Sequence, residues 1–596
     1  MKRSFLVVLI FLFGNYGLYS QNKINIFNMA FDSLELNNII AGAHSSGILF
    51  CHLQGESGNY NWFPKFEYPA GSGKNTIFIS NLWIGGLDSN DSIHMAGELY
   101  RQSGKDFQPG PISNNYDSVY NLRWNRLWKI SKEEVEFHKL NWDQSGYEPI
   151  EAIASWPGNG NTAMGQADQL APYFDYDNDN MYDPMKGDYP LIRGDKTVFF
   201  IYNDDIVHTE TQGKRLGIEL HCMVYGFDPP RNSGLDNSVF VHYDFINRSA
   251  DIYHDTYIGV FTDLDIGYAW DDYVGCNVGL GSFYGYNGVE IDGNGEPEAY
   301  GENPPVQSVT FLAGPFMDPN QEDDPDGGCD FSINGLNFGN GIVDDERYGM
   351  TRFIVFENSG HINGTPNVAE EYYNYLIGKW RDSSPMLYGS THNGGGGLGP
   401  ECRFMYPGDS DPCNWGTNGI PPNGGFNQDS LFWTEETVYN DPSDRRGVGV
   451  TGPITLHPGE VEEVELAYAV GVNSGTVHSA IENLNNTLSD LFTRVENGEL
   501  IIPNASLGND EYASRELDLN LFPNPSQKRI SLRTNDSHES FYSFRIYNLL
   551  GNIMLSGKVN MAGSATIDIS KLSPGIYTMN LFSDKTFTRK KFIKIH

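Results

Sequence analysis

The sequence predicts a mainly β protein: a β-sandwich-rich, multi-domain body with long loops and a late helix, followed by a small C-terminal Ig-like β-sandwich. The 596 residues include 66 Gly and 31 Pro, residue types that build turns. Short aromatic and β-branched runs alternate with clusters of Gly, Asn, Asp and Pro, a pattern typical of strands joined by turns. The hydrophobic fraction of 39% is enough to build packed cores. No repeat of about 20–50 residues is evident, so we do not expect a propeller or a solenoid.

The N-terminus has the three-part pattern of a secretory signal peptide. A basic segment, Met1–Arg3, precedes the apolar run Phe5–Phe13, and a more polar stretch ends at Ser20. The apolar run is well short of the roughly 20 residues that span a bilayer. We therefore predict that residues 1–20 are removed during export. No later stretch is long and apolar enough to cross a membrane, so we expect no transmembrane span.

The body divides by its patterns into an N-terminal β-rich region, 21–195, which contains an Asp-rich loop, and a central β-sandwich region, 196–500, which ends in a helix. Residues 238–247 alternate apolar and polar side chains, which predicts a strand with one buried face. Turn residues bound several other short runs of strand-forming residues. These further strands are predicted at 256–261, 454–456 and 461–470.

The late helix is predicted at 478–495. Apolar side chains recur there every three or four residues, which places them on one face of the helix. The predicted stripe consists of Ile481, Leu484, Leu488, Leu491 and Phe492.

A polar linker, 501–516, is predicted between the body and a C-terminal module, 517–596. The module has 11 basic and 5 acidic residues, whereas residues 21–516 have 26 basic and 72 acidic residues. The formal charge therefore changes from −46 to +6 across the linker, which indicates two modules with different partners. The acidity of the body argues against a nucleic-acid partner, because contacts with phosphates require Lys and Arg.

The C-terminal module combines strands with turns at regular positions. Its four characteristic segments are Leu521–Ser526, Phe544–Gly551, Ile567–Tyr577 and Lys590–Ile595. Proline fixes φ and removes a donor, glycine permits tight turns, and alternating Ile, Leu and Tyr supply a core. About 80 residues of this kind can form a small seven-stranded sandwich. The residues that carry the pattern are Pro523, Asn524, Pro525, Gly551, Pro574, Gly575 and Tyr577.

In their order, these four segments resemble the type A C-terminal sorting domain of Bacteroidota type IX secretion cargo. The resemblance implies that the chain passes through the periplasm and crosses the outer membrane through the type IX translocon. It also implies cleavage by a sortase-like peptidase, followed by release or attachment to surface lipopolysaccharide. The expected location is therefore outside the cell or on its outer surface.

The body is similar to large secreted proteins of the same bacteria that have no established activity. The segments that carry this similarity are Tyr68–Lys74, Leu82–Leu87, Gln108–Pro111 and Thr256–Gly259. The similarity transfers no catalytic residue.

An Asp-rich loop at 175–183 is the strongest metal candidate. Calcium prefers oxygen ligands at alternate positions of a loop, including one backbone carbonyl. Asn180 stands where such a loop turns sharply, and Asp188 is a candidate late ligand. Position 12 of the loop is Lys186 rather than the Glu of an EF-hand, and the alternative is a solvated acidic turn. The predicted structural calcium ligands are Asp175, Asp177, Asp179, the carbonyl of Met181, and Asp183.

A second acidic cluster is a weaker metal candidate. Asp263 and Asp265 lie on the same face of a predicted strand, and the following loop can return Asp271 or Asp272 to them. The alternative is an acidic loop surface. A zinc site is a further hypothesis, and it requires that two predicted strands bring four side chains together. These are His208, Glu210, Glu219 and His221, for which ordinary polar positions on a sheet are the alternative.

The six cysteines do not form a disulfide framework, and no CxxC pair is present. Cys402 and Cys413 bracket a turn-rich segment, which makes them the candidate disulfide. The pairing of the other cysteines is open.

No sequence motif points to catalysis. Neither HExxH nor GxSxG occurs, and carboxylates are too common for a glycosidase pair to be selected. We expect a non-enzymatic surface or secreted protein that is stabilised by calcium, namely an adhesin, a glycan-binding protein or an envelope component. The alternative is a secreted hydrolase that acts on polysaccharide or protein.

Overall fold

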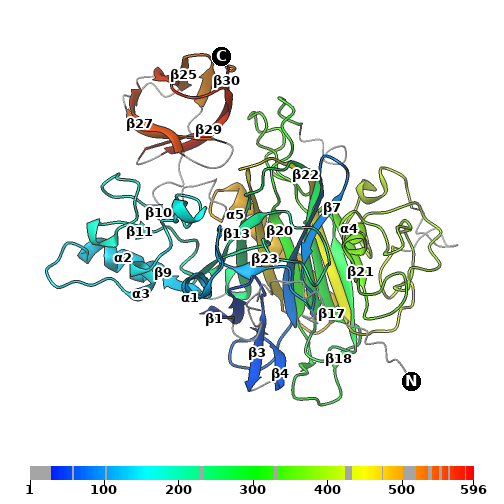
Figure 1. Ribbon diagram of the computed structural model, residues 1–596. Coiled ribbons are helices and arrows are strands. Elements are labelled where there is room, and N and C mark those ends of the chain that lie inside the picture. The colour runs from blue at the N-terminus through cyan, green and yellow to red at the C-terminus, as the bar shows by residue number, and fades with distance from the viewer. Residues whose placement is uncertain are drawn as a thin grey trace, which may run out of the picture.

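Runs of aromatic and β-branched residues form most of the regular structure, which is mainly β as predicted (Figure 1). The computed structural model describes residues 29–595 except for eleven short gaps. Among the described residues, no helix combines the length and apolar character that crossing a membrane requires. The predicted signal peptide, 1–20, and linker, 501–516, lie outside the described residues. The gaps are 57–58, 101–103, 229–233, 326–332, 423–431, 473, 501–518, 535–539, 549–552, 562–563 and 584–585.

A nine-stranded antiparallel sheet is the larger of the two main sheets in the described part of the body. Its main path runs β16-β17-β20-β23-β14-β13-β12-β8, and β9 also pairs with β12. In that order the strands are β16 (Asp272–Asn277), β17 (Ser282–Asn287), β20 (Val306–Ala313), β23 (Val461–Gly471), β14 (Ser238–Asn247), β13 (Ile218–Gly226), β12 (Lys196–Asn203), β8 (Gln108–Pro109) and β9 (Trp128–Ser131).

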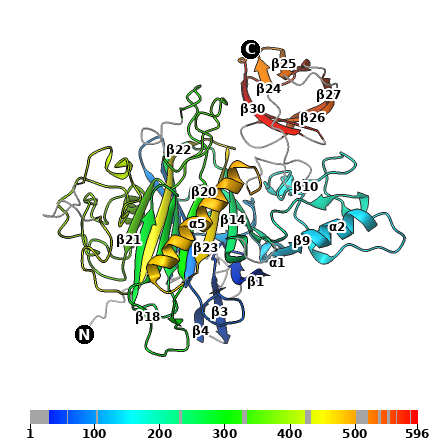
Figure 2. The same cartoon turned by 180° about the vertical axis from the view of Figure 1, so that it is seen from behind.

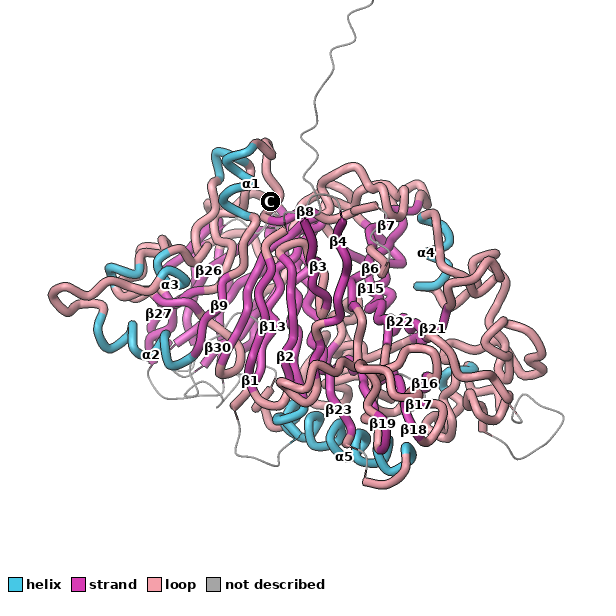
Figure 3. Tube along the Cα trace, turned by 90° about the horizontal axis from the view of Figure 1, so that it is seen from below, coloured by secondary structure: helices cyan, strands magenta, loops and turns pink. Residues whose placement is uncertain are grey.

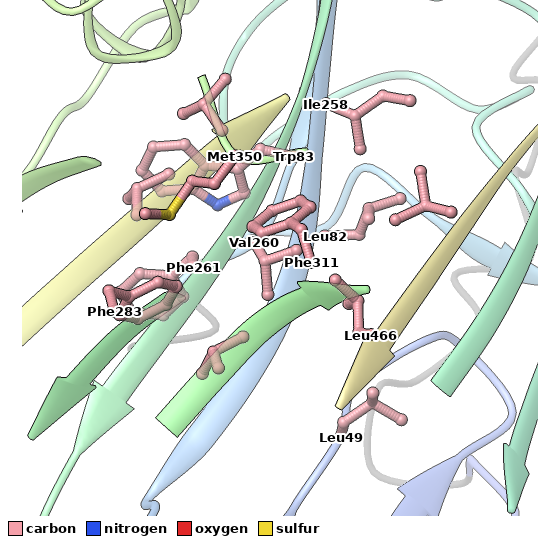
Figure 4. Packing of buried hydrophobic residues seen from close by; sticks show 14 of the residues in the cluster. Leu49, Leu82, Trp83, Ile258, Val260, Phe261, Phe283, Phe311, Met350 and Leu466 are labelled. Carbon is pink, nitrogen blue, oxygen red and sulfur yellow. The ribbon is translucent and has the colours of Figure 1, made fainter. Parts of the chain in front are cut away.

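A five-stranded antiparallel sheet faces the nine-stranded one, so the body is a β-sandwich. Side chains from the facing strands interdigitate between the two sheets, as in other sandwiches. Figure 4 shows part of this core, where Leu82 and Val260 of one sheet approach Phe311 and Leu466 of the other. The strands, in sheet order, are β21 (Arg352–Phe356), β22 (Arg445–Leu456), β15 (Tyr253–Leu264), β6 (Ile79–Leu87) and β7 (Ile93–Gly97).

Helix α5 (Val477–Glu496) covers the outer face of the nine-stranded sheet (Figure 2). The side chain of Thr476 caps its first turn, and the helix ends at Glu496 with Asn497 as its C-cap. The predicted helix is confirmed, and Leu484, Leu488 and Leu491 are fully buried as expected. Ile481 and Phe492 are only partly buried, because the stripe that faces the sheet is completed by Ala480 and Val495.

Helix α4 (Ala369–Leu376) covers the outer face of the five-stranded sheet, and the sequence analysis did not predict it. Its Tyr372 ring packs edge-on against Trp83 of β6, with the ring centroids 4.7 Å apart. Trp83 in turn stacks on Phe261 of β15. Each main sheet therefore has a helix on its outer face. The core beneath α5 also includes buried side chains from an earlier segment, Tyr120, Trp124 and Ile153.

The strand at 238–247 is confirmed as β14, but it is buried on both faces rather than one. One set of side chains, including Val239 and Val241, enters the core between the sheets. Phe240 enters the second core beneath α5. The alternating pattern predicted that the second face is exposed to solvent. In the structure, α5 and its neighbours cover that face.

Consecutive strands cross from one sheet to the other. Strand β14 belongs to the nine-stranded sheet, whereas β15, which contains the predicted strand 256–261, belongs to the five-stranded sheet. The predicted strands at 454–456 and 461–470 lie in β22 and β23, and the turn between them crosses between the sheets in the opposite direction. These two connections join the layers of the sandwich.

The predicted boundary at residue 195 does not divide the body into two cores. Strands β6 and β7 from the N-terminal side pair within the five-stranded sheet, and β8 and β9 pair with β12. Non-local strand pairing therefore merges the two regions. Smaller pairings involve β1 (Phe31–Leu36), β2 (Ile39–His44) and β5 (Phe66–Glu67), β3 (Cys51–Glu56) with β4 (Asn59–Pro64), and β18 (Ile291–Asp292) with β19 (Gly301–Glu302).

A lobe with three short helices projects from one side of the sheets, opposite to α4 (Figure 3). Its helices are short and rich in polar residues, so their apolar periodicity is too brief to identify from sequence. A capping box at Ser131 and Glu134 starts the second helix. The lobe contains α1 (Ser118–Trp124), α2 (Lys132–Asn141), α3 (Glu151–Ala154), β10 (Tyr173–Phe174) and β11 (Tyr189–Pro190).

The C-terminal module has seven strands among its described residues, in sheets of three and four, and a hydrophobic core of its own. This agrees with the predicted small sandwich. The three-stranded sheet consists of β24 (Leu519–Phe522), β25 (Arg529–Thr534) and β28 (Ser564–Asp568). The four-stranded sheet consists of β27 (Ile553–Met561), β26 (Ser540–Asn548), β29 (Gly575–Ser583) and β30 (Thr586–Lys594).

Candidate functional site

The Asp-rich loop of the lobe brings Asp175 and Asp177 together with Asp188. One carboxylate oxygen from each lies within 4.8 Å of the others. Asp188, named only as a late ligand in the sequence analysis, is fully buried and accepts backbone hydrogen bonds from Tyr176 and Asp183. These bonds hold its carboxylate towards the loop.

The backbone of the loop turns through left-handed residues at Asn178 and Asn180, with φ values of 59° and 62°. The expectation of a sharp turn at Asn180 is therefore confirmed, and asparagine adopts this conformation more readily than most residues. The carboxylate of Asp175 accepts hydrogen bonds from the backbone N–H groups of Asp179 and Asn180. The chain thus folds around the carboxylate of its first acidic residue.

The other predicted ligands have different partners. Asp179 pairs with Lys186 at 2.5 Å, and Lys186 also lies 3.5 Å from Asp177. Asp183 accepts a hydrogen bond from the backbone of Met185 and caps the short helix there. The carboxylates of Asp179 and Asp183 are therefore outside the group of three.

The donor set of the group fits calcium, because carboxylate oxygens are the ligands that this hard cation prefers. Burial, and then the neighbouring charges of Asp175 and Asp177, raise the pKa of Asp188, against hydrogen bonds that lower it. A divalent cation between the three carboxylates would relieve this repulsion.

The second acidic cluster forms with a different third member. Asp263 and Asp265 of the β15 end lie together as predicted, and Asp444 joins them. The guanidinium of Arg446 lies 3.3 Å from Asp263 and 2.7 Å from Asp444. Burial, and then repulsion from Asp444, raise the pKa of Asp265 to about 7.

Asp271 and Asp272 do not complete this group of three. Asp272 is fully buried and accepts a hydrogen bond from the backbone of Ile266. Asp271 accepts one from the backbone of Gly293. Both carboxylates stabilise the loop after β15.

A buried ionic network on the nine-stranded sheet was missed by the sequence analysis. We call it the His242 network; it lies on β14, β23 and neighbouring segments. The imidazole of His242 lies 3.0 Å from Glu465 and 3.1 Å from Asp244. Arg193 approaches Glu465 at 3.4 Å, and the hydroxyl of Tyr225 donates to Glu465 at 2.7 Å. The network therefore holds both signs of charge in the interior.

Strand register creates the His242 network. His242 lies opposite Glu465, and Asp244 lies opposite Glu463, across the β14–β23 pair. Each strand has two polar residues two positions apart, His242 and Asp244 on β14 and Glu463 and Glu465 on β23. This spacing is the only sign of the network in the sequence. The pairing of strands more than 200 residues apart cannot be deduced from either segment alone.

The zinc hypothesis is wrong. His221 and Glu219 do pair, at 2.9 Å, and both are buried. His208 instead lies against the backbone carbonyls of Met95 and Asp204. The two histidines therefore have separate partners, because the segment containing His208 does not form the predicted strand of a hairpin.

The predicted disulfide between Cys402 and Cys413 is wrong. Cys402 is a free, buried thiol whose sulfur contacts the carbonyl of Met386 at 3.6 Å, whereas Cys413 is disulfide-bonded. The segment between them turns Cys402 into the core and leaves Cys413 half-buried. The spacing of the two cysteines along the chain did not reveal that their side chains lie in different environments.

The predicted motif residues of the C-terminal module stabilise its turns. The side chain of Asn524, between Pro523 and Pro525, donates to the carbonyl of Lys591 and accepts from the N–H of Ile593. These bonds tie the first motif to the last strand. The ring of Tyr577 stacks on Phe592, and its hydroxyl donates to Ser573, just before Pro574 and Gly575. Gly551 lies outside the described residues.

Comparisons with known proteins give one family match. Residues 520–595 match the family described as the secretion system C-terminal sorting domain. A search among curated proteins finds no match.

Two solved structures show only weak similarity. A protein titled polysaccharide lyase aligns with 63% of this chain and 34% of its own, at 7% identity and a TM-score of 0.17. Dimeric latent PorU from Porphyromonas gingivalis aligns with 68% of this chain and 32% of its own, at 10% identity and a TM-score of 0.12. The chain thus spans about a third of the length of either structure.

Proposed function

We propose, from the premise that the chain ends in a type IX secretion sorting domain, that its body is a calcium-stabilised, non-enzymatic adhesin, glycan-binding protein or envelope component. The premise rests on the family match at residues 520–595, which agrees with the four segments identified in the sequence. The chain is accordingly exported to the cell surface or beyond it. Its partners in export are the secretion machinery and, as we propose, the sortase-like peptidase that removes the tail, with surface lipopolysaccharide or glycan as the final attachment.

The calcium proposal is carried by the grouping of Asp175, Asp177 and Asp188. Three carboxylates that meet at one point repel one another unless a cation is present. Lys186 supplies one positive charge at the edge of the group, at 3.5 Å from Asp177. Outside the cell, calcium is abundant enough to occupy sites of modest affinity.

The non-enzymatic proposal is supported by the His242 network, whose acid–base groups pair with one another. His242, Asp244 and Glu465 neutralise one another and Arg193 inside the nine-stranded sheet. A catalytic group must reach a substrate, whereas His242 and Glu465 are almost completely buried. These groups therefore support a structural role.

A hydrolase is the second candidate, and Asp265 is the observation that favours it. A carboxyl group with a pKa of about 7 is suited to donate a proton at neutral pH. Activity towards polysaccharides or proteins that is lost in Asp265→Asn would support this alternative.

The test of the calcium proposal is thermal unfolding of the full purified chain in 2 mM EDTA and in about 2 mM CaCl2, within the affinity range of extracellular calcium modules. We expect calcium to raise Tm, because a ligand at about 2–20 times its Kd stabilises the folded state by about 0.6–1.8 kcal/mol. The double variant Asp175→Asn, Asp177→Asn should lose this shift. The control Asp143→Asn, an exposed carboxylate in the same lobe, should keep it. Equal Tm values with and without calcium would refute the proposal.

A further inference from the structure

The lobe contains a cavity whose lining has an unusual charge for this protein. Its volume is about 290 Å³, and it lies between α1, α3 and the end of the Asp-rich loop. The only charged side chains among its described lining residues are Arg123 and Arg126. The body as a whole has a formal charge of −46, so a cavity whose charged lining side chains are both cations is a local exception. The uncharged lining residues are Trp124, Trp128, Ala154, Ser155, Trp156, Pro157, Asn159, Tyr182 and Pro184.

Each of the two arginines lies over an aromatic ring. The guanidinium of Arg123 lies 5.1 Å from the ring centroid of Trp124, and that of Arg126 lies 4.7 Å from Trp128. Stacking uses the face of a guanidinium and leaves the N–H donors in its plane to bind acceptors such as carboxylates. The indoles are almost completely buried, so they support the arginines from a rigid wall.

The two arginines differ in their remaining partners. Arg126 donates to Glu151 at 2.5 Å and to Ser155 at 2.9 Å. Among the described residues, no carboxylate forms an ion pair with Arg123, which is exposed at the cavity. Arg123 is therefore the cation that is available to an incoming anion.

The cavity is connected to the candidate calcium loop. Tyr182 and Pro184, which line it, belong to the segment that follows Asp175–Asp179. The side chain of Asn159 accepts a hydrogen bond from the N–H of Tyr182 and donates one to its carbonyl. The loop thus sets the position of one wall of the cavity.

From these contacts we infer that the cavity binds an acidic sugar residue of a glycan, with the sugar's anionic group on Arg123, beside the Arg126 that is paired with Glu151. This rests on the proposed glycan-binding function and specifies its ligand. The volume lies at the lower end of the range for small-molecule pockets, which suits one or two sugar residues rather than a long chain. Aromatic walls and neutral polar groups complement the C–H faces and hydroxyls of a sugar, and the arginines select for negative charge.

The experiment is calorimetric titration of the full chain, in calcium, with a galacturonate disaccharide and with the neutral galactose disaccharide. We expect the acidic disaccharide to bind at least about tenfold more tightly, since one charge-assisted contact contributes about 1.5 kcal/mol or more. Arg123→Gln should remove this preference, and Arg123→Lys should retain part of it. The matched control Arg494→Gln, on α5 and outside the cavity, should leave binding unchanged.

The outcomes separate this inference from the function on which it rests. Equal affinity for the two disaccharides, or an acidic preference that survives Arg123→Gln, would overturn the cavity as the site. Glycan binding that is insensitive to Arg123 would leave the broader function intact. If the chain binds no member of a glycan array of acidic and neutral sugars, both the inference and the glycan-binding function are wrong.

Discussion

His242 is a buried imidazole between two carboxylates, and this position determines its charge. Burial and the nearby Arg193 lower its pKa, but Asp244 and Glu465 outweigh them and raise the pKa to about 9. The imidazole is therefore protonated at neutral pH in the folded protein. In the unfolded chain the ordinary pKa is about 6.5.

The pH dependence of stability follows from this difference. The stabilisation from His242 is fully present below about pH 6.5 and is lost as the pH rises through 9, by about 3 kcal/mol at most. We expect the free energy of unfolding in urea, measured from pH 6.5 to 9.5, to fall more steeply in the wild type than in His242→Gln. The exposed control His361→Gln should retain the wild-type slope. Parallel slopes for the wild type and His242→Gln would contradict the prediction.

The ion pair between Arg445 and Glu435 is fully buried, with Nε and Oε1 separated by 2.9 Å. Removing one partner leaves the other charge uncompensated in the interior, which typically costs about 3–5 kcal/mol. We expect Arg445→Met to reduce the free energy of urea unfolding by that amount. The double variant Arg445→Met, Glu435→Gln should recover part of the loss, and a double variant as unstable as the single one would contradict this account.

An exposed pair provides the comparison. Arg494 and Asp490 form an ion pair on the surface of α5, at 2.9 Å. Because solvent screens it, Arg494→Met should change stability by less than about 1 kcal/mol.

At the scale of elements, α5 shows that a local pattern can determine a helix, its ends and the face that it buries. Leu488 is fully buried between α5 and the nine-stranded sheet. Leu488→Ala should therefore cost about 2–5 kcal/mol in urea unfolding, because it leaves a cavity. The exposed neighbour Asn486→Ala should stay within about 0.5 kcal/mol of the wild type. Similar losses in the two variants would mean that α5 does not pack as described.

The strands and the helices could be predicted from the sequence to different degrees. The β-branched and aromatic runs of β14 and β23 were visible in the sequence, and their bounds agree with the structure. The short helices α1, α2 and α3 were not, because each offers too few turns for a periodic pattern. Helix α4 is longer, but its tyrosines resemble the aromatic residues of the neighbouring strands.

At the scale of the whole molecule, the tail is a separate folding unit with its own core and the opposite charge to the body. Such a unit can be recognised by the export machinery while the body remains unaltered. Deleting residues 517–596 in the native bacterium should leave the protein in the periplasm, as measured by cell fractionation and immunoblotting. Fusing residues 517–596 to a periplasmic reporter should carry the reporter to the surface or the medium. Normal export of the truncated chain would contradict this role.

The candidate sites were predictable only where their residues are close in sequence. The Asp-rich loop could be located because Asp175 and Asp177 lie in one turn, and Asp188 follows within the same segment. The third member of the second cluster, Asp444, is separated from Asp263 by about 180 residues of sequence, and strand β22 brings it there. The cavity lined by Arg123 and Arg126 could not be predicted from the sequence either, because its walls come from several segments of the lobe.

The sequence by itself determined the export tail, the mainly β class, the late helix and the acidic loop, because composition, turn residues and side-chain periodicity are local properties. Only the tertiary structure decided which strands pair, that β14 is buried on both faces, that Cys402 is not the partner of Cys413, and that two arginines line one cavity. Those features depend on contacts between distant segments. The free energy of each such contact is set by register and packing, and neither is written in any single stretch of the chain.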